Sequence, residues 1–220
     1  EICACLVGSE MCIRDRYTCL GNWETREGNA NIEETLLTAY LSRRGYTDKE
    51  IRSAIAKFKQ AANSLGGGLY NANKEVYTLL RYGVNVQAEV TEKKKMVHLI
   101  DWANPMENDF QIAEEVTIQG ESDRRPDLVV YVNGIALAVI ELKRSTVSAH
   151  EGIRQNIRNQ QDGYIPRFFT TIQLLFAGND TEGLHYGVIK TPEKFWLRWK
   201  EPCGEPCKPC LLYTSDAADE

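Results

Sequence analysis

Two short apolar runs joined by Asn133-Gly134 constrain the fold of this chain more than any other feature. The runs are Leu128–Val132 and Ile135–Leu142, both rich in aliphatic side chains. Asn-Gly between two such runs is a strong signal for a tight turn between antiparallel strands. The sequence therefore predicts a β-hairpin, and charged side chains stand at its open end.

The register of this hairpin decides which charged residues lie together. With a two-residue turn, Asp127 and Glu141 fall on opposite faces. With a three-residue turn that pairs Tyr131 with Ile135, or with an equivalent bulge, Asp127, Glu141 and Lys143 share one face. We expect this second register because it separates polar from apolar residues better. The opposite face would then be apolar, made of Leu128, Val130, Val132, Ala136, Ala138, Ile140 and Leu142.

The charged end of the hairpin has residue types suited to phosphodiester hydrolysis, which needs charge neutralisation and an activated water. We expect Asp127 and Glu141 to hold Mg²⁺, with Mn²⁺ as a substitute, together with the backbone carbonyl of Leu142. Lys143 would position or deprotonate the water. The spacing Asp-x13-Glu-x-Lys alone is weak, because acids and lysines are common at strand ends. An ordinary charged sheet edge is the alternative.

A helix is expected to follow, since Ser148 and Glu151 have capping-box spacing. Gln160 and Tyr164 lie four residues apart near its end. We expect these two side chains to support the site and contact DNA. Helix packing with a buried hydrogen bond is the alternative.

The net charge of −5 argues against nucleic-acid binding by the whole surface. Any such contact must be local. Basic residues gather in the sequence around the candidate site: Arg124, Arg125, Lys143, Arg144, Arg154, Arg158 and Arg167. Arg125 and Arg144 flank the acids and the lysine and are the expected DNA contacts. A solvated basic face is the alternative.

Glu34 has two interpretations. Its spacing from Asn31 is that of a capping box at a helix start, which we favour, and a metal-binding role is the alternative. The three histidines, His98, His150 and His185, have no metal-ligand spacing and are expected to be structural.

The two ends of the chain are expected to be artefacts rather than protein. Met11–Asp15 and Cys210–Thr214 can be encoded by complementary strands of one DNA, as in a translated sequencing adapter. We therefore expect residues 1–16 and 203–220 to be disordered artefact and residues 17–202 to form one α/β domain. All seven cysteines lie near the ends, so we expect no zinc site. Residues 20–202 hold no cysteine, which fits a reducing cytoplasm, and no apolar run is long enough to span a membrane.

The periodicity elsewhere predicts further elements. We expect helices over 31–45, 49–64, 73–82 and 191–199, and strands over 84–90, 96–100, 110–118, 170–177 and 186–190. Together with the hairpin, they indicate an α/β fold with a mixed sheet flanked by helices.

Several motifs resemble one family. They are Leu69–Asn73, Tyr77–Gly83, Leu99–Trp102, Arg125–Asp127, Val132–Gly134, Glu141–Lys143 and Gly152–Gln155. The chain is similar over 23–199 to the N-terminal nuclease domain of the restriction (R) subunit of type I restriction enzymes. The arrangement also resembles the PD-(D/E)xK nucleases that have an extra Gln-x3-Tyr motif.

The resemblance implies a restriction-endonuclease-like core, with Asp127, Glu141 and Lys143 at the family's metal and lysine positions and Gln160 and Tyr164 at its Gln and Tyr. It implies cleavage of double-stranded DNA in the prokaryotic cytoplasm, within an ATP-driven complex that contains modification and specificity subunits. The chain has no Gly-x4-Gly-Lys-Ser/Thr loop, so ATP binding would belong to the motor downstream. The alternatives are a stand-alone nuclease of the same superfamily and a non-catalytic DNA-binding or docking module.

Overall fold

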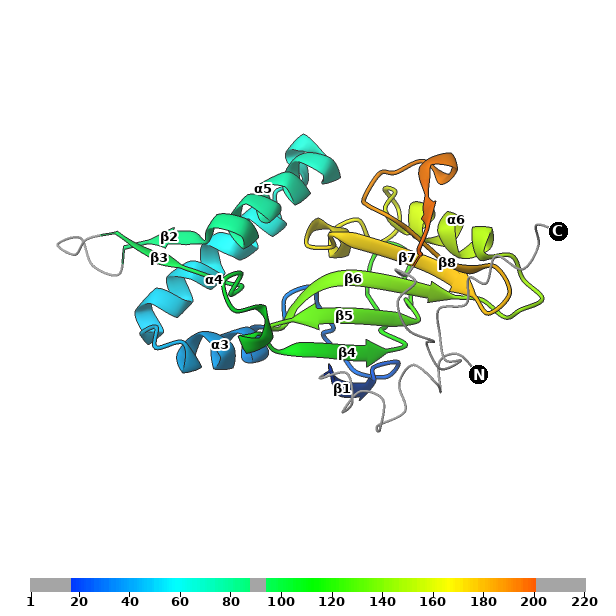
Figure 1. The fold of residues 1–220 in the computed structure, drawn as a ribbon. Helices are drawn as coiled ribbons and strands as arrows, with labels where there is room; N and C mark the ends of the chain where they lie inside the picture. The colour runs from blue at the N-terminus through cyan, green and yellow to red at the C-terminus, as the bar shows by residue number, and fades with distance from the viewer. Residues whose placement is uncertain (1–16, 88–93, 201–220) are drawn as a thin grey trace.

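A large mixed sheet runs through the protein in the computed structural model, which describes residues 17–87 and 94–200 (Figure 1). Its strands stand in the order β1-β4-β5-β6-β7-β8-β9, and β2 and β3 form a separate pair. The strands are β1 (Tyr17–Asn22), β2 (Val84–Val86), β3 (Lys95–Val97), β4 (Phe110–Glu114), β5 (Leu128–Val132), β6 (Ile135–Leu142), β7 (Leu174–Asn179), β8 (Gly183–Gly187) and β9 (Leu197–Arg198).

Helices flank this sheet. The α-helices are α3 (Glu34–Arg43), α4 (Asp48–Ala62), α5 (Leu69–Tyr82) and α6 (Ala149–Asn159). Short 3-10 helices are η1 (Leu65–Gly67), η2 (Pro105–Glu107), η3 (Phe168–Thr170) and η4 (Glu193–Phe195). The expected mixed α/β fold is confirmed. Strand β1 was not expected from the sequence; it pairs in parallel with β4.

The helix α6 connects two parallel strands, β6 and β7, as such strands require a long crossover. The Ser148 hydroxyl caps α6 by accepting from the His150 N–H, which confirms the cap. Glu151 pairs with Arg154 instead of closing a capping box. Ser148 also donates to Glu182.

The β5–β6 hairpin has the two-residue turn, so the predicted three-residue turn is wrong. Val132 pairs with Ile135, and Asn133 and Gly134 have φ of +54° and +80°. The equivalent bulge is present, because the register shifts between Val130 and Tyr131. After the bulge Leu128 pairs with Ile140, which brings the preceding and following acids to one face as expected.

The two faces of the hairpin differ from the prediction. The larger core lies on the face of Glu141 and contains Val129, Tyr131 and Val139. Ala136, expected on the other face, joins this core because the bulge shifts it. The opposite face carries a smaller apolar cluster around Leu128, with Ile140 and Leu142 half-buried. The acids therefore lie on the side of the sheet that helix α6 covers.

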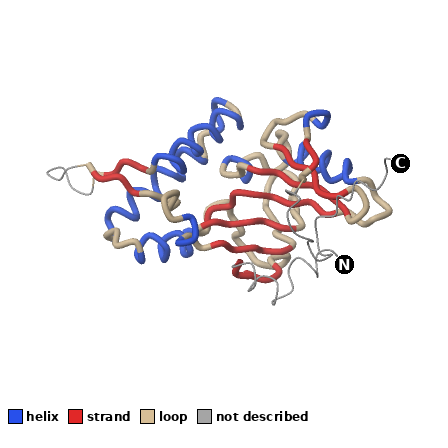
Figure 2. Tube along the Cα trace, viewed as in Figure 1, coloured by secondary structure: helices blue, strands red, loops and turns tan. Residues whose placement is uncertain are grey.

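A second core holds together what we term the helical lobe, formed by α3, α4, α5, β2 and β3 at one end of the sheet (Figure 2). Phe58, Val76 and Leu99 are fully buried there, and Ile135 joins them from the turn end of the hairpin. A capping box at Thr47 and Glu50 starts α4. Helix α5 begins at Leu69, earlier than expected, directly after the glycine break.

Two local predictions are wrong. The Asn31 capping box is absent: Glu33 is the N-cap of α3, and the Asn31 amide donates to Arg167 and Thr170. The expected helix at 191–199 is η4 followed by β9, which pairs with β8. Pairing with the sheet edge outweighs the local helical pattern there. No helix among residues 17–87 and 94–200 is long and apolar enough to cross a membrane.

The predicted artefact segments, 1–16 and 203–220, lie outside the described residues, as do all cysteines except Cys19. Cys19 is half-buried and makes no disulfide. Residues 88–90 of the strand expected at 84–90 also lie outside the described residues.

Candidate functional site

Three charged side chains meet at the open end of the hairpin, and we term Asp127, Glu141 and Lys143 the acid–lysine cluster. Lys143 Nζ lies 3.6 Å from Glu141 Oε2 and 3.9 Å from Asp127 Oδ2. The backbone N–H of Leu142 donates to Asp127 Oδ2 at 2.6 Å, which fixes the Asp127 carboxylate against β6. The structure thus brings together the three residues predicted to be catalytic.

The Glu141 carboxylate is the unusual member of this cluster. Its side chain is 0% exposed, and its Oε1 atom has no hydrogen-bond partner within the described chain. Burial raises the pKa of Glu141 well above the ordinary value, and the negative charge of Asp127 raises it further. Lys143 opposes this shift without cancelling it. A buried carboxylate with a free oxygen is costly unless a cation or proton compensates it.

Gln155 of α6 joins two members of the cluster. Its Nε2 donates to Glu141 Oε2 at 2.7 Å, and its Oε1 accepts from Lys143 Nζ at 2.9 Å. The sequence reasoning did not select Gln155 as a site residue, although it belongs to the Gly152–Gln155 motif. The sequence spacing between Glu141 and Gln155 does not predict their contact, because the contact depends on how α6 packs on β6.

A glycine in the same helix allows this approach. A Cβ atom built on Gly152 would lie 3.1 Å from the Ala177 Cβ and 3.4 Å from the Glu141 Cβ. Helix α6 therefore packs tightly on β6 and β7 at this position. The close packing keeps water away from Glu141 and accounts for its burial.

Gln160 and Tyr164 lie apart from the contacts that hold Lys143. Gln160 is buried; it donates to the Asn156 carbonyl and accepts from the Lys190 N–H. Tyr164 lies under the Arg124 guanidinium, 4.3 Å from its ring centroid. The predicted supporting and DNA-contact roles of these two residues stay predictions.

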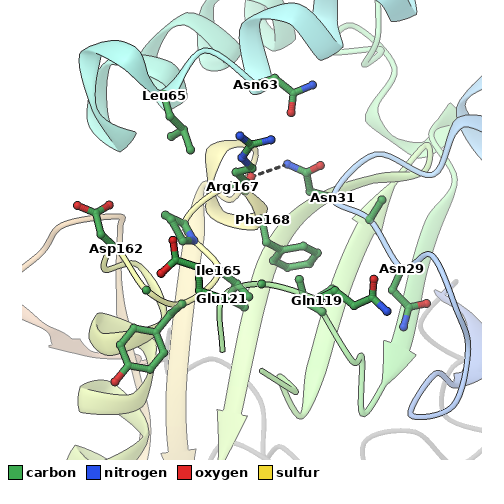
Figure 3. Close-up of a pocket in the computed structure, with 16 residues that line it drawn as sticks. Asn29, Asn31, Asn63, Leu65, Gln119, Glu121, Asp162, Ile165, Arg167 and Phe168 are labelled. Carbon is green, nitrogen blue, oxygen red and sulfur yellow. Dashed lines mark hydrogen bonds between the residues drawn. The ribbon is translucent and has the colours of Figure 1, made fainter. Parts of the chain in front are cut away.

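Tyr164 also lines an open hollow of about 460 Å³ between the sheet and the end of α4 (Figure 3). Asn63, Glu121, Asp162 and Arg167 surround it, and Asn31 donates to the Arg167 carbonyl at its rim. The acid–lysine cluster does not line this hollow. This hollow and the buried acid therefore belong to different parts of the molecule.

The other predicted site residues have separate surroundings. Arg125 forms ion pairs with Glu24 and Glu115, which neutralise much of its charge. Arg144 is exposed next to Lys143 in the chain. Glu34 is exposed and pairs with Lys59 at 2.5 Å. The favoured capping role of Glu34 is wrong, since Glu33 is the N-cap.

The histidines do not form a metal centre. His150 lies 2.9 Å from Glu193, and its ring centroid is 6.0 Å from that of His185. Burial lowers the pKa of His185. Over 17–87 and 94–200, no three His, Cys, Asp or Glu residues are grouped to hold a metal. A cation at the acid–lysine cluster would therefore need backbone or water ligands besides its two carboxylates.

Fold and site together define a mixed α/β protein with a buried acid, a second acid and a lysine at the ends of two central strands of its sheet. The chain belongs to the family described as type I restriction enzyme R protein N terminus, which it matches over residues 13–194.

Individual proteins show the same likeness. The chain is 29% identical over 154 residues to the MjaIXP endonuclease subunit of Methanocaldococcus jannaschii, covering 66% of this chain and 14% of that protein. It is 30% identical over 133 residues to the SsaAORF53P endonuclease subunit of Staphylococcus saprophyticus, covering 60% and 13%. Both are named as type I restriction enzyme subunits. The chain spans only about a seventh of these relatives.

Proposed function

We propose that this chain is the Mg²⁺-dependent DNA endonuclease domain of a type I restriction R subunit. The observation that carries the proposal is the Glu141 carboxylate, which is fully buried, has a free oxygen and stands beside a second acid and a lysine. Strongly shifted carboxylates of this kind are concentrated at functional sites. The family and the names of the relatives support the same class of activity.

The acids fit a divalent cation. Asp127 and Glu141 would hold Mg²⁺ or Mn²⁺ through carboxylate oxygens, with the Leu142 carbonyl as the proposed backbone ligand. The cation would stabilise the ionised form of Glu141, whose pKa burial and Asp127 now raise. When bound, it supplies charge neutralisation at the phosphate and lowers the pKa of a coordinated water.

The protein's own groups do the positioning. Gln155 fixes the Lys143 ammonium within 4 Å of both carboxylates. From there Lys143 holds the attacking water or neutralises the developing negative charge. The Leu142 N–H keeps Asp127 oriented, so the cluster needs little rearrangement to act.

The whole R subunit is proposed to move DNA with ATP, in a complex with modification and specificity subunits. The motor would lie in the much longer remainder that relatives of this family contain. This chain itself is expected neither to bind nor to hydrolyse ATP.

The test is a Mn²⁺ titration of the 220-residue chain with a short DNA duplex present. Binding is measured as the decrease in the electron paramagnetic resonance signal of free Mn²⁺. Glu141→Ala should lose binding, whereas Glu34→Ala, an acid removed far from the cluster, should bind like the unmodified chain. Equal Mn²⁺ binding by all three proteins, or no binding by any of them, would reject the proposal and favour a non-catalytic module of the same fold. A downstream coding sequence without motor motifs would instead indicate a stand-alone nuclease.

A further inference from the structure

Helix α5 carries a surface stripe in which aromatic and basic side chains alternate. We term Tyr70, Lys74, Tyr77 and Arg81 the α5 stripe. Their spacings of four, three and four residues place them in one row along the helix, about 16 Å long. The row contains no carboxylate, since Glu75, the acid of α5, lies well to one side of it.

The opposite face of α5 fixes the direction in which the stripe points. Ala72, Val76 and Leu80 are buried there. Asn73 is buried as well, and its amide donates to the carbonyls of Thr170 and Ile172. These contacts prevent the helix from rotating, so the stripe stays on the surface. In Figure 1, α5 forms the upper edge of the helical lobe.

All four side chains of the stripe are exposed. Tyr70 is 62% exposed and Tyr77 is 49% exposed. Within the described chain, no hydrogen-bond or ionic partner is found for either phenol or for the Lys74 ammonium. A contiguous row of exposed rings is a better indication of a binding surface than a single exposed side chain.

Trp102 extends the stripe at its C-terminal end. It is 47% exposed, its indole N–H donates to the Leu80 carbonyl, and the Arg81 guanidinium lies 5.3 Å from its ring centroid. The hydrogen bond holds the indole in place beside the stripe. The extended surface therefore has three exposed rings and two cationic side chains.

We propose that the α5 stripe and Trp102 bind single-stranded DNA. Alternating cations and exposed rings suit a single strand, because the cations pair with phosphates and the rings stack on unpaired bases. In a duplex the base faces are already stacked and inaccessible to Tyr70 and Tyr77. The positive stripe also contrasts with the overall charge of −5, so it is a local site rather than a general affinity.

This inference rests on the proposed function, because it gives the DNA substrate a second contact in the helical lobe. The two can fail separately, since the stripe involves no residue of the acid–lysine cluster. Strand binding by the stripe needs no divalent cation and is therefore measurable in EDTA.

The experiment measures fluorescence anisotropy of a labelled oligothymidylate with the 220-residue chain at low salt in EDTA. Tyr70→Ala/Tyr77→Ala should weaken binding about tenfold or more, as loss of two stacking rings predicts. Lys74→Glu/Arg81→Glu should weaken it similarly and flatten the salt dependence. Arg52→Glu/Lys194→Glu changes the same net charge elsewhere and should bind almost as the unmodified chain does. Circular dichroism verifies that each variant is folded.

Glu141→Gln separates the two proposals. It should bind the oligothymidylate normally in EDTA while losing Mn²⁺ affinity. The stripe proposal is overturned if the oligothymidylate does not bind, if the charge-matched control loses as much affinity as the stripe variants, or if a duplex of the same length binds equally well. An unchanged affinity in both stripe variants would likewise reject it and leave the exposed rings to a protein partner.

Discussion

The two ends of the β5–β6 hairpin bury polar side chains in opposite ways. At the turn end, the Asn133 amide donates to the Leu99 carbonyl and to Asn108 Oδ1 and accepts from the Asp109 N–H. Asn108 in turn accepts from Tyr40 and donates to the Asp101 and Pro105 carbonyls. At the open end, Glu141 is equally buried but keeps one oxygen without a partner.

The two ends differ in whether their buried polar groups have all their hydrogen-bond partners. Buried amides with complete hydrogen bonds hold the helical lobe to the sheet and have no remaining capacity to bind. A buried carboxylate with a free oxygen and a raised pKa costs stability in the absence of a ligand. Within one hairpin, the turn end therefore serves stability, and the open end is where the proposed metal ion would offset this cost.

The largest effect should come from removing the lysine of the open end. In the proposed restriction complex, Lys143→Ala should reduce DNA cleavage about 10²- to 10⁴-fold, as loss of a proton-transfer or charge-stabilising group does. The folded state should remain, because Lys143 is at the edge of the core. Supercoiled plasmid cleavage measures the rate. Cleavage at the unmodified rate would show that Lys143 has no catalytic role.

A substitution at the turn end should instead lower the stability of the fold. Asn133→Ala removes three hydrogen bonds, two of them buried, and places alanine at φ +54°, so the free energy of unfolding should fall by about 3 kcal/mol. Urea denaturation measures this change. Asn85→Ala, at an exposed position of β2, is the control and should change stability by less than about 0.5 kcal/mol. Equal effects at the two positions would contradict the structural role of Asn133.

A side chain that supports the cluster should act on affinity. Gln155→Ala releases both Glu141 and Lys143, so Mn²⁺ binding should weaken roughly 10- to 100-fold, as for other residues that orient metal ligands. The titration of free Mn²⁺ reports it. Gln155→Glu adds a carboxylate beside Glu141 and should alter the pH dependence of binding as well. An unaltered affinity in Gln155→Ala would limit Gln155 to packing.

The smallest effect concerns stability without metal. The folded-state pKa of Glu141 lies above its unfolded-state value, so the folded protein holds more protons between the two, and its stability falls as pH rises through that window. Glu141→Gln should therefore be more stable than the unmodified chain at neutral pH in EDTA, by about 1 kcal/mol or more. The advantage should shrink toward acidic pH. Thermal unfolding at several pH values measures it, and a destabilised variant at neutral pH would show that Lys143 and Gln155 already compensate the charge.

Local sequence was enough to predict the hairpin, though not the length of its turn, and the meeting of the three charged residues of the candidate site. The turn dipeptide and the spacing of the apolar residues are properties of neighbouring positions, and a β-strand repeats its side-chain direction every two residues. These regularities determined that Asp127, Glu141 and Lys143 meet once a bulge is present. Three of the family motifs, Arg125–Asp127, Val132–Gly134 and Glu141–Lys143, lie in the same segment.

The tertiary structure alone decided which face of the hairpin is covered, which glutamine reaches the cluster and which elements residues 193–198 form. Gln155 contacts Glu141 because α6 folds back over the sheet, and residues 197–198 form a strand because β8 offers an unpaired edge. Such contacts depend on the packing of segments distant along the chain, which local spacing does not encode. The pKa of Glu141 follows from that packing too, since burial by α6, not the residue type, raises it.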